Sequence, residues 1–162
     1  MQIGSNPAAI AHIHGDRAHA ALNGFVRLYQ MRQGVLVEAE LYGLPTSPNP
    51  CAPNIFALHI HEHGSCTGNQ EDAFADVGSH FNPQGCPHPA HAGDLPPLFG
   101  MRGYAWGAVY TERFRVAQVL GRAVIVHAGP DDFTSQPAGN AGAKIGCGII
   151  QPSSMDLSAG MV

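Results

Sequence analysis

The chain has 162 residues and a formal net charge of −4 at pH 7, and only 12% of its residues are charged. This length suits a single domain, and the negative charge argues against nucleic acid as a partner. No run of 18 apolar residues occurs, so we expect no membrane-spanning helix and no membrane partner. The 20 glycines and 13 prolines favour short strands and many turns over helices.

The two ends of the chain are expected to lie outside the folded domain. Residues 1–7 lack the charged region and the apolar region of a signal peptide. We therefore expect the protein either to be cytoplasmic or to be an exported protein whose leader has been removed. We expect an N-terminal extension at residues 1–8, one domain at residues 9–150 and a frayed C-terminal tail at residues 151–162.

Alternation of apolar and polar residues predicts a series of short strands between turns rich in glycine and proline. The expected strands cover residues 8–15, 24–30, 35–42, 56–63, 103–110, 121–127 and 145–150. Prolines make residues 94–98 extended, and residues 116–120 form either a strand or a turn. Seven or eight short strands at this spacing predict an all-β sandwich or barrel.

Candidate metal ligands gather in one stretch of the chain, far more densely than chance would place them. They are His59, His61, His63, His80, His88, His91 and Asp94. Leu58 and Ile60, in the same expected strand, point to the core. His59 and His61 therefore share the opposite face. His127 ends another expected strand and faces the same way, which gives a third imidazole beside this pair.

The later ligands lie on a loop, because the glycines and prolines of residues 78–94 prevent regular structure. Three imidazoles and one carboxylate on such a loop can surround a tetrahedral ion, and these donors suit zinc. His80 can also serve the first site, since each of its ring nitrogens can bind one metal. An all-imidazole site suits copper, which cycles between two oxidation states, or zinc, which does not. A purely structural zinc and surface histidines unrelated to metal are the alternatives.

The four cysteines, Cys51, Cys66, Cys86 and Cys147, contain no C-x-x-C pair, which argues against a zinc site built on thiolates. Their even number permits two disulfides in three alternative pairings, although disulfides do not suit a reducing cytoplasm. Free buried thiols are the alternative.

Several segments match a set of sequence motifs that is highly specific when taken together. They are H-I-H-E-H-G at 59–64, G-S-H-F-N-P at 78–83, H-x-x-D from His91 to Asp94, G-R-A-V-I-V-H at 121–127 and G-N-A-G-x-x-I-x-C-G at 139–148. The eight-residue step from His80 to His88 also matches. On these grounds the chain resembles the copper-zinc superoxide dismutase family, of the bacterial kind, from about Ala9 to Ile150.

The resemblance implies an eight-stranded Greek-key β-barrel, related to the immunoglobulin-like sandwich, with long metal-binding and active-site loops. It implies an enzyme that converts superoxide anion to oxygen and hydrogen peroxide with a redox-cycling copper and a zinc, as a monomer or a homodimer. The implied copper ligands are His59, His61, His80 and His127, and the implied zinc ligands are His80, His88, His91 and Asp94. His80 would bridge the two metals and gain a proton when copper is reduced.

The resemblance also implies a supporting role for three residues outside the ligand sets. Asp131 matches an aspartate that hydrogen-bonds ligands of both metals and fixes their orientation, and an ordinary turn aspartate is the alternative. Cys66 and Cys147 match the family's disulfide, which ties the ligand loop to the barrel. For the two remaining cysteines, Cys51 and Cys86, we expect a second disulfide.

Lys144 is a departure from the family, which usually has an arginine beside copper, and it is the only lysine in the chain. We expect it to act catalytically, as a cation that attracts the superoxide anion. Docking should be weaker than with arginine, because lysine lacks the planar fork, and a merely solvated lysine is the alternative. His63 is a second departure, which we expect to be a surface residue rather than a spare ligand. The roles of His12 and His14, a further H-x-H pair, stay open.

Two other functions remain as alternatives to the enzyme. One is a non-catalytic module that binds or stores copper, zinc or haem on the same barrel, and the other is a structural protein that holds zinc alone. Family members that have lost catalysis tend to lose copper ligands, and here every implied copper ligand is present. The enzyme is therefore the favoured interpretation.

Overall fold

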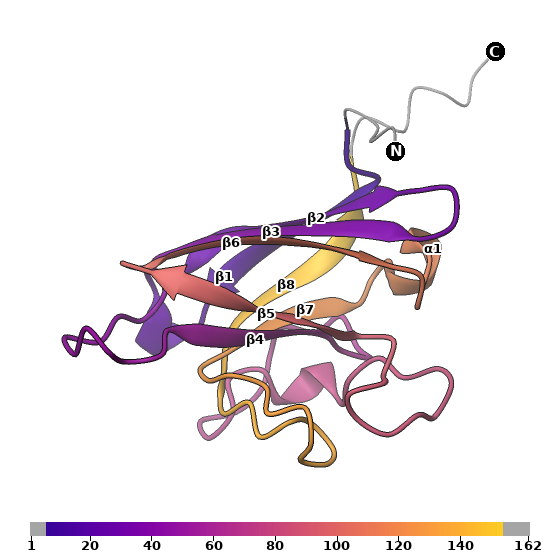
Figure 1. The fold of residues 1–162 in the computed structure, drawn as a ribbon. Coiled ribbons are helices and arrows are strands. Elements are labelled where there is room, and N and C mark those ends of the chain that lie inside the picture. Colours follow the sequence, from indigo (N-terminus) through magenta and orange to yellow (C-terminus); the bar gives the residue numbers. More distant parts are fainter. Residues whose placement is uncertain (1–5, 154–162) are drawn as a thin grey trace.

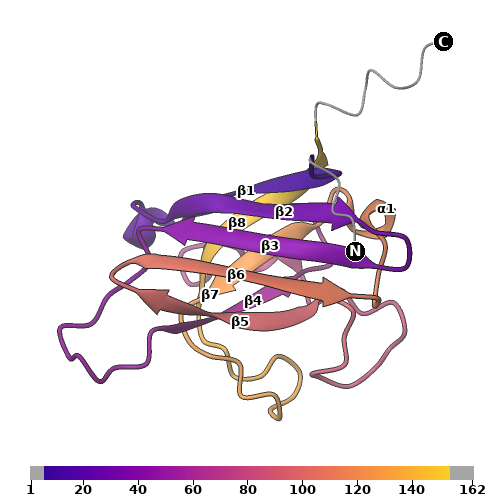
Figure 2. The same ribbon diagram turned by 45° about the horizontal axis from the view of Figure 1, so that its top comes forward.

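The computed structural model describes residues 6–153, and nearly all of their regular structure is antiparallel β. The strands are β1 (Ala9–Gly15), β2 (Asn23–Gln30), β3 (Val35–Tyr42), β4 (Ile55–Ile60), β5 (Asp94–Met101), β6 (Tyr104–Thr111), β7 (Ala123–His127) and β8 (Lys144–Pro152). They form one closed barrel in the order β1-β2-β3-β6-β5-β4-β7-β8 (Figure 1, Figure 2). The barrel neighbours β3–β6 and β4–β7 are not consecutive in the chain, as in a Greek key. The predicted eight-stranded Greek-key barrel is therefore confirmed.

The structure describes only part of the two terminal segments that were expected from the sequence. Residues 1–5 and 154–162 lie outside the described residues. Gln151 and Pro152, expected in a frayed tail, instead continue β8 and pair with Ile10 and Ala9 of β1. Among residues 6–153, no helix is long and apolar enough to cross a membrane.

The segment at residues 94–98 is more than extended, because it begins β5 and pairs with β4. Pro96 and Pro97 have no N–H group to give to a strand ladder. The register of the β4–β5 pair shifts between Phe56 and Leu58, opposite these prolines. This irregularity lets the strand continue without ladder hydrogen bonds from the two prolines.

The segment at residues 116–120 is neither the strand nor the turn that we expected, but the single helical turn α1 (Val116–Val119). Val116 and Val119 are spaced three apart, which places them on one side of the turn, and both are buried in the main core. The Gln118 side chain accepts a hydrogen bond from the Arg115 N–H at the start of the turn. Two 3₁₀ turns, η1 (Arg17–His19) and η2 (Ala75–Val77), complete the regular structure of the described residues.

Two apolar clusters lie on opposite sides of the barrel wall. The interior cluster contains alternate strand residues such as Val26, Leu28, Val124 and Val126. The outer cluster contains Phe74, Val77, Ala123, Ile125 and Cys147. Since side chains alternate along a strand, β7 contributes to both clusters, and the loop after β4 packs on its outer face.

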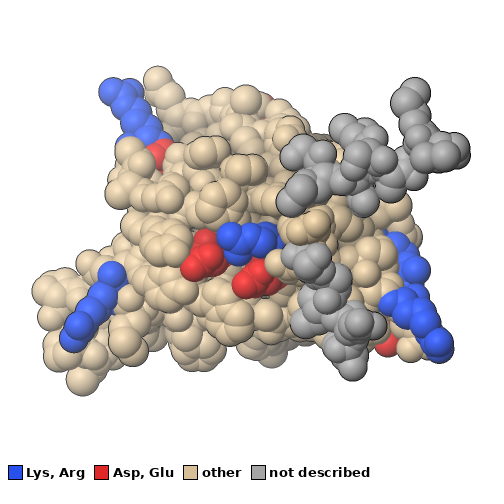
Figure 3. All heavy atoms as spheres, turned by 90° about the horizontal axis from the view of Figure 1, so that it is seen from above, with Lys and Arg blue, Asp and Glu red and all other residues tan. Residues whose placement is uncertain are grey.

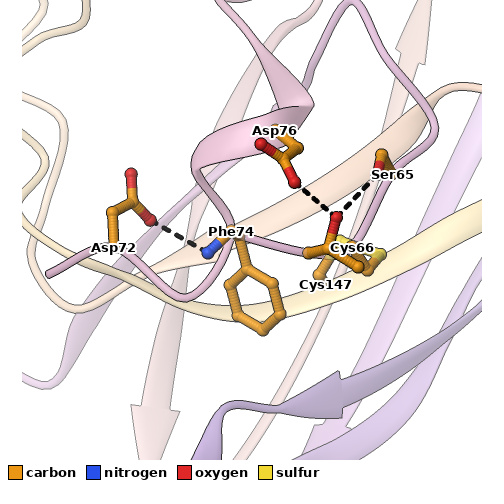
Figure 4. Close-up of a disulfide and its surroundings, with 7 residues drawn as sticks. Ser65, Cys66, Asp72, Phe74, Asp76 and Cys147 are labelled. Carbon is orange, nitrogen blue, oxygen red and sulfur yellow. Dashed lines mark hydrogen bonds between the residues drawn. A yellow bond between two sulfur atoms is a disulfide. The ribbon is translucent and has the colours of Figure 1, made fainter. Parts of the chain in front are cut away.

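Two long loops extend from the same side of the barrel (Figure 1). They are residues 61–93 between β4 and β5 and residues 128–143 between β7 and β8. The disulfide between Cys66 and Cys147 attaches the first loop to β8 (Figure 4). Seen from the side away from these loops, the surface is mostly uncharged, with a positive side chain between acidic ones near its centre and other charged side chains toward its edges (Figure 3). His61, His80, His88 and His91 lie in the first of the two loops.

The expected second disulfide is absent, because Cys51 and Cys86 are both free thiols in the described structure. Cys51 precedes β4 and is exposed, whereas Cys86 follows β4 in the long loop and is half-buried. An even number of cysteines does not place two of them side by side. The expectation of a second disulfide was therefore wrong.

Candidate metal centre

Within residues 6–153, the side chains able to hold a metal ion form two adjoining groups. The first group is His59, His61, His80 and His127, and the second is His80, His88, His91 and Asp94. In each group the donor atoms lie within 4.8 Å of one another, and His80 belongs to both. None of the six histidines is more than 7% exposed. The fold thus brings the two predicted ligand sets together around one shared imidazole.

The strands β4 and β7 position the first group. His59 lies in β4 and His127 ends β7. The strand β4 stops at Ile60, earlier than predicted, but His61 stays beside β7 because its N–H donates to the Ala123 carbonyl at 2.8 Å. The ring centroids of His59 and His61 are 6.5 Å apart, so the alternation predicted from the sequence holds through His61.

Three other histidines singled out in the sequence stay outside both groups. His63 follows the end of β4 and is exposed, as expected for a surface residue. His12 and His14 are exposed on β1, and the His12 ring packs edge-on against Phe25 with centroids 4.9 Å apart.

Backbone carbonyls fix the orientation of two imidazoles in the first group. His61 Nδ1 donates to the Gly78 carbonyl at 2.8 Å, and His127 Nδ1 donates to the Gly142 carbonyl at 3.2 Å. Each hydrogen bond keeps the proton on Nδ1 and leaves Nε2 with a free lone pair. The sequence contained no signal for these two acceptors beyond the glycines of the loop motifs.

Asp131 joins one histidine of each group. Its Oδ2 accepts from His59 Nε2 and its Oδ1 from His88 Nε2, both at 2.8 Å. It also accepts from the Phe133 N–H at 2.7 Å, as a turn aspartate does. The backbone of Gly139, at φ 69°, passes so close that a Cβ there would lie 2.0 Å from Asp131 Oδ1. The carboxylate therefore occupies a fitted position between the two groups.

Five ring nitrogens are buried without any hydrogen-bond partner in the described residues. They are His59 Nδ1, His61 Nε2, His80 Nε2, His88 Nδ1 and His127 Nε2. Buried polar atoms are normally satisfied, because leaving one unpaired costs free energy. Four of the five belong to the first group, one from each of its members. A metal ion that accepts their lone pairs would satisfy all four, so the residues present fit the implied copper.

The donor atoms of the second group have the spacing of a tetrahedral site. His80 Nδ1 lies 2.7 Å and His91 Nδ1 3.3 Å from Asp94 Oδ1, and His88 Nδ1 lies 3.1 Å from Asp94 Oδ2. The Nδ1 atoms of His80 and His91 are 3.4 Å apart. Bonds of about 2.0–2.1 Å to a tetrahedral zinc place neighbouring ligand atoms about 3.3 Å apart. The residues present therefore also fit the implied zinc.

Burial lowers the pKa of three imidazoles of the first group, those of His59, His61 and His127, and keeps them uncharged. It lowers the pKa of His61 to about 3 and the pKa of His127 to about 4. It also lowers the pKa of His59, further than either. A histidine must be neutral to bind a metal ion, so the barrel holds these side chains in the binding form at neutral pH.

Lys144 lies beside the first group and is paired with a carboxylate that the sequence analysis did not single out. It lines a solvent-open pocket of about 1310 Å³ together with His61, His80 and His127. Its Nζ, however, forms an ion pair and hydrogen bond with Asp72 Oδ2. Asp72 comes from the long loop, 72 residues away in the chain, and sequence reasoning missed it because no periodicity or motif links the two positions.

The chain matches one protein family over most of its length. A family model described as copper/zinc superoxide dismutase matches residues 22–150. The Cu-Zn superoxide dismutase 2 of Aquifex aeolicus (strain VF5) is 32% identical over 156 residues, which covers 87% of this chain and 86% of the relative. The Cu-Zn superoxide dismutase of Photobacterium leiognathi is 32% identical over 142 residues, 79% of this chain and 78% of the relative.

Solved structures show the same fold. A Cu/Zn superoxide dismutase from Brucella abortus superposes with a TM-score of 0.72 at 22% identity, covering 88% of this chain and 99% of that one. A double mutant of a superoxide dismutase-like protein from Bacillus subtilis gives a TM-score of 0.70 at 28% identity, with 88% and 96% covered. Together with the family match over residues 22–150, these findings show that the chain belongs to the copper/zinc superoxide dismutase family.

Proposed function

We propose that this protein is an enzyme that converts two superoxide anions and two protons to one oxygen and one hydrogen peroxide. The observation that carries the proposal is the set of four buried imidazole nitrogens without a hydrogen-bond partner in the described residues. One of them belongs to His80, whose ring is shared with the second group. Relatives named Cu-Zn superoxide dismutase support the same reaction.

The two groups would hold two different metals. His59, His61, His80 and His127 would hold copper, and His80, His88, His91 and Asp94 would hold zinc. Imidazoles alone suit a redox-active copper, whereas imidazoles with a carboxylate suit zinc. When bound, copper supplies a one-electron acceptor and donor, and zinc supplies a fixed positive charge beside it.

The His80 ring is the proton carrier in this proposal. Its Nδ1 lies 2.7 Å from Asp94 Oδ1, on the side of the second group, which leaves Nε2 for the first. His80 lines the open pocket, so a proton on Nε2 can pass to departing peroxide, and water supplies the second proton. Asp131 and the carbonyls of Gly78 and Gly142 hold the other imidazoles in one tautomer meanwhile.

Lys144 would attract the anionic substrate, because it is the cation beside His61 and His127 in the pocket wall.

A non-catalytic storage module on the same barrel is less well supported, since the pocket leaves the first group accessible to a small anion.

Metal analysis combined with an activity assay tests the proposal. We expect about one copper and one zinc per chain, as in the two ligand groups, and superoxide removal that follows the copper content. His61→Ala should lose copper and activity while it keeps zinc, because His61 belongs to the first group alone. Elemental analysis and a superoxide-removal assay before and after copper addition measure both quantities.

His63→Ala is the matched control, because His63 is two residues away but exposed and outside both groups. It should keep both metals and full activity. Zinc alone in the parent protein, with no superoxide removal after copper is supplied, would contradict the proposed reaction and favour the storage module.

The compartment remains one of the two alternatives given by the sequence. The disulfide between Cys66 and Cys147 supports an oxidising compartment. Relatives include bacterial proteins and an extracellular Cu-Zn superoxide dismutase of Homo sapiens, which is 32% identical over 150 residues, 83% of this chain and 58% of the relative.

A further inference from the structure

The ion pair between Asp72 and Lys144 lies in the wall of the pocket beside the first ligand group. Lys144 begins β8 and pairs with His127 in the β7–β8 ladder. The side chain of Lys144 is 18% exposed and that of Asp72 is 35% exposed. The pair is therefore reachable by a small anion in the pocket, yet it lies next to a candidate copper ligand.

Asp72 is held in place by the loop around it. Its Oδ1 accepts from the Phe74 N–H at 3.0 Å (Figure 4), which leaves Oδ2 for Lys144. The N–H of Asp72 donates to Asn69 Oδ1 at 3.0 Å. A Cβ on Gly68 would lie 2.1 Å from the Asp72 carbonyl oxygen, so the turn is tightly packed. These contacts fix the backbone that presents the carboxylate.

The disulfide ties this loop to the strand that carries Lys144. Cys66 precedes the Asp72 turn, and Cys147 follows Lys144 by three residues on β8 (Figure 4). The two partners of the ion pair are thus joined through a covalent bond close by. This connection makes the pair a fixed part of the pocket wall rather than a chance contact of two mobile side chains.

Charge, not size, must select the substrate in this pocket. Its volume of about 1310 Å³ is far larger than a diatomic anion requires, since one water occupies about 30 Å³ in the liquid. The charged residues in its wall are Asp16, Arg17, Glu62, Glu71, Asp72 and Lys144. Acidic groups outnumber basic ones there, so the state of Lys144 has a large effect on an approaching anion.

We propose that Asp72 is a positioning residue for Lys144 and that it sets how strongly the pocket attracts anions. It fixes the ammonium group beside the first ligand group and offsets most of its charge. Removing the carboxylate charge should leave Lys144 unpaired and increase anion binding. This inference rests on the proposed function only for the identity of the anion, which is superoxide. The ion pair itself does not depend on that function.

Asp72→Asn tests the inference directly, with azide as the probe anion. An absorption titration of the copper-loaded variant should show azide binding about two- to tenfold tighter, as for loss of one nearby negative charge. The kcat/KM for superoxide should rise at low ionic strength and fall more steeply with added salt. Asp72→Glu, which keeps the charge, should restore the parent values.

Glu71→Gln is the matched control, because it makes the same change in net charge one residue away. Glu71 lines the same pocket but forms no ion pair within residues 6–153. Its effect on azide binding should be clearly smaller than that of Asp72→Asn. Equal effects of the two variants would show that only net charge matters and would overturn the role of Asp72.

A double-mutant cycle isolates the pair itself. If Asp72 acts through Lys144, Asp72→Asn in a Lys144→Met background should change azide affinity no more than Glu71→Gln does in the parent. A full effect in that background, or weaker azide binding by Asp72→Asn alone, would overturn the inference.

A metal-free measurement separates this inference from the proposed function. Lys144 is the only lysine, so its side-chain NMR signal is unambiguous. That signal should shift in Asp72→Asn and stay unchanged in Glu71→Gln, and an unchanged signal in Asp72→Asn would overturn the ion pair. A parent protein that binds azide but does not consume superoxide would refute the reaction and leave the role of Asp72 standing.

Discussion

A single carboxylate, Asp131, controls the tautomer of one histidine in each ligand group. It is 5% exposed and accepts from the Nε2 atoms of His59 and His88. Holding the proton on Nε2 leaves Nδ1 of both rings free, and both Nδ1 atoms are among the bare buried nitrogens. The orientation of one imidazole in each group therefore depends on a side chain that belongs to neither group.

Asp131→Asn should weaken both metal sites. The amide oxygen can still accept from one Nε2–H, but the NH₂ group facing the other ring favours a proton on that ring's Nδ1, the atom needed for metal binding. Affinity for zinc and copper should fall about 10- to 100-fold, as measured by competition with a chelator for each metal.

Asp132→Asn is the control, because this neighbouring carboxylate is exposed and accepts only from Thr134 and Ser135 in its own turn. It should leave both affinities unchanged. Metal affinities in Asp131→Asn equal to those of the parent would mean that the ligands are oriented without this carboxylate.

For single residues, the sequence predicted the positions of side chains in strands better than the positions of side chains in loops. His59 and His61 were predictable because alternate strand residues share a face. Asp72 was not, because its contact with Lys144 depends on the path of a loop without periodicity. The sequence therefore placed a cation at Lys144 without its carboxylate partner, and the attraction of superoxide by Lys144 stays a prediction.

The long loop between β4 and β5 has little regular structure, and a covalent bond holds it to the barrel. The disulfide from Cys66 to Cys147 spans a sequence separation of 81 residues. Beneath it, Phe74 and Val77 of the loop pack against Ala123 and Ile125 of β7. Loop and barrel are therefore joined by the disulfide and by a small apolar cluster.

Replacing Cys66 and Cys147 together by alanine should destabilise the metal-free protein by about 2–5 kcal/mol, because the unfolded chain gains the freedom of a long open loop. Denaturant unfolding of the metal-free parent and variant under the same conditions measures this change in the free energy of unfolding. Replacing Cys51 and Cys86 by alanine is the control, since both are free thiols. A control variant destabilised as much as the disulfide variant would argue against the bridge.

Element boundaries differed from the prediction where tertiary contacts compete with local pattern. Pro96 and Pro97 suggested only an extended segment, but an irregular β4–β5 register accommodates them within a strand. Val116 and Val119 suggested a strand or turn, yet both can enter the core from one helical turn. Strand pairing and core access are not encoded in either short segment alone.

For the whole molecule, the seven or eight predicted strands indicated a sandwich or barrel and the motif resemblance implied an eight-stranded Greek key, whereas the strand order comes from the structure. The barrel wall and the two loops bury six histidines in one small region. Burial lowers the pKa of His59, His61, His91 and His127, which couples the stability of the entire fold to pH, because these imidazoles would take up protons more readily once the chain unfolds.

The metal-free protein should lose stability as pH falls from about 6.5 to about 4. The pKa of His61 is lowered to about 3 and that of His127 to about 4 by burial, so in the folded state His61 stays largely neutral across this range and His127 protonates only at its lower end. In the unfolded chain they protonate near pH 6.5, so the unfolded state binds more protons. Each contributes a slope of up to about 1.4 kcal/mol per pH unit, measurable by denaturant unfolding at a series of pH values.

His127→Leu should reduce this slope in the metal-free protein, because it removes one buried imidazole that protonates on unfolding. His63→Ala is the control, because His63 is exposed and lies outside both ligand groups. A stability profile that is flat between pH 6.5 and pH 4.5 would contradict burial of neutral histidines in the folded chain. With metals bound, the loss should be steeper, because protons then compete with the ions for the same nitrogens.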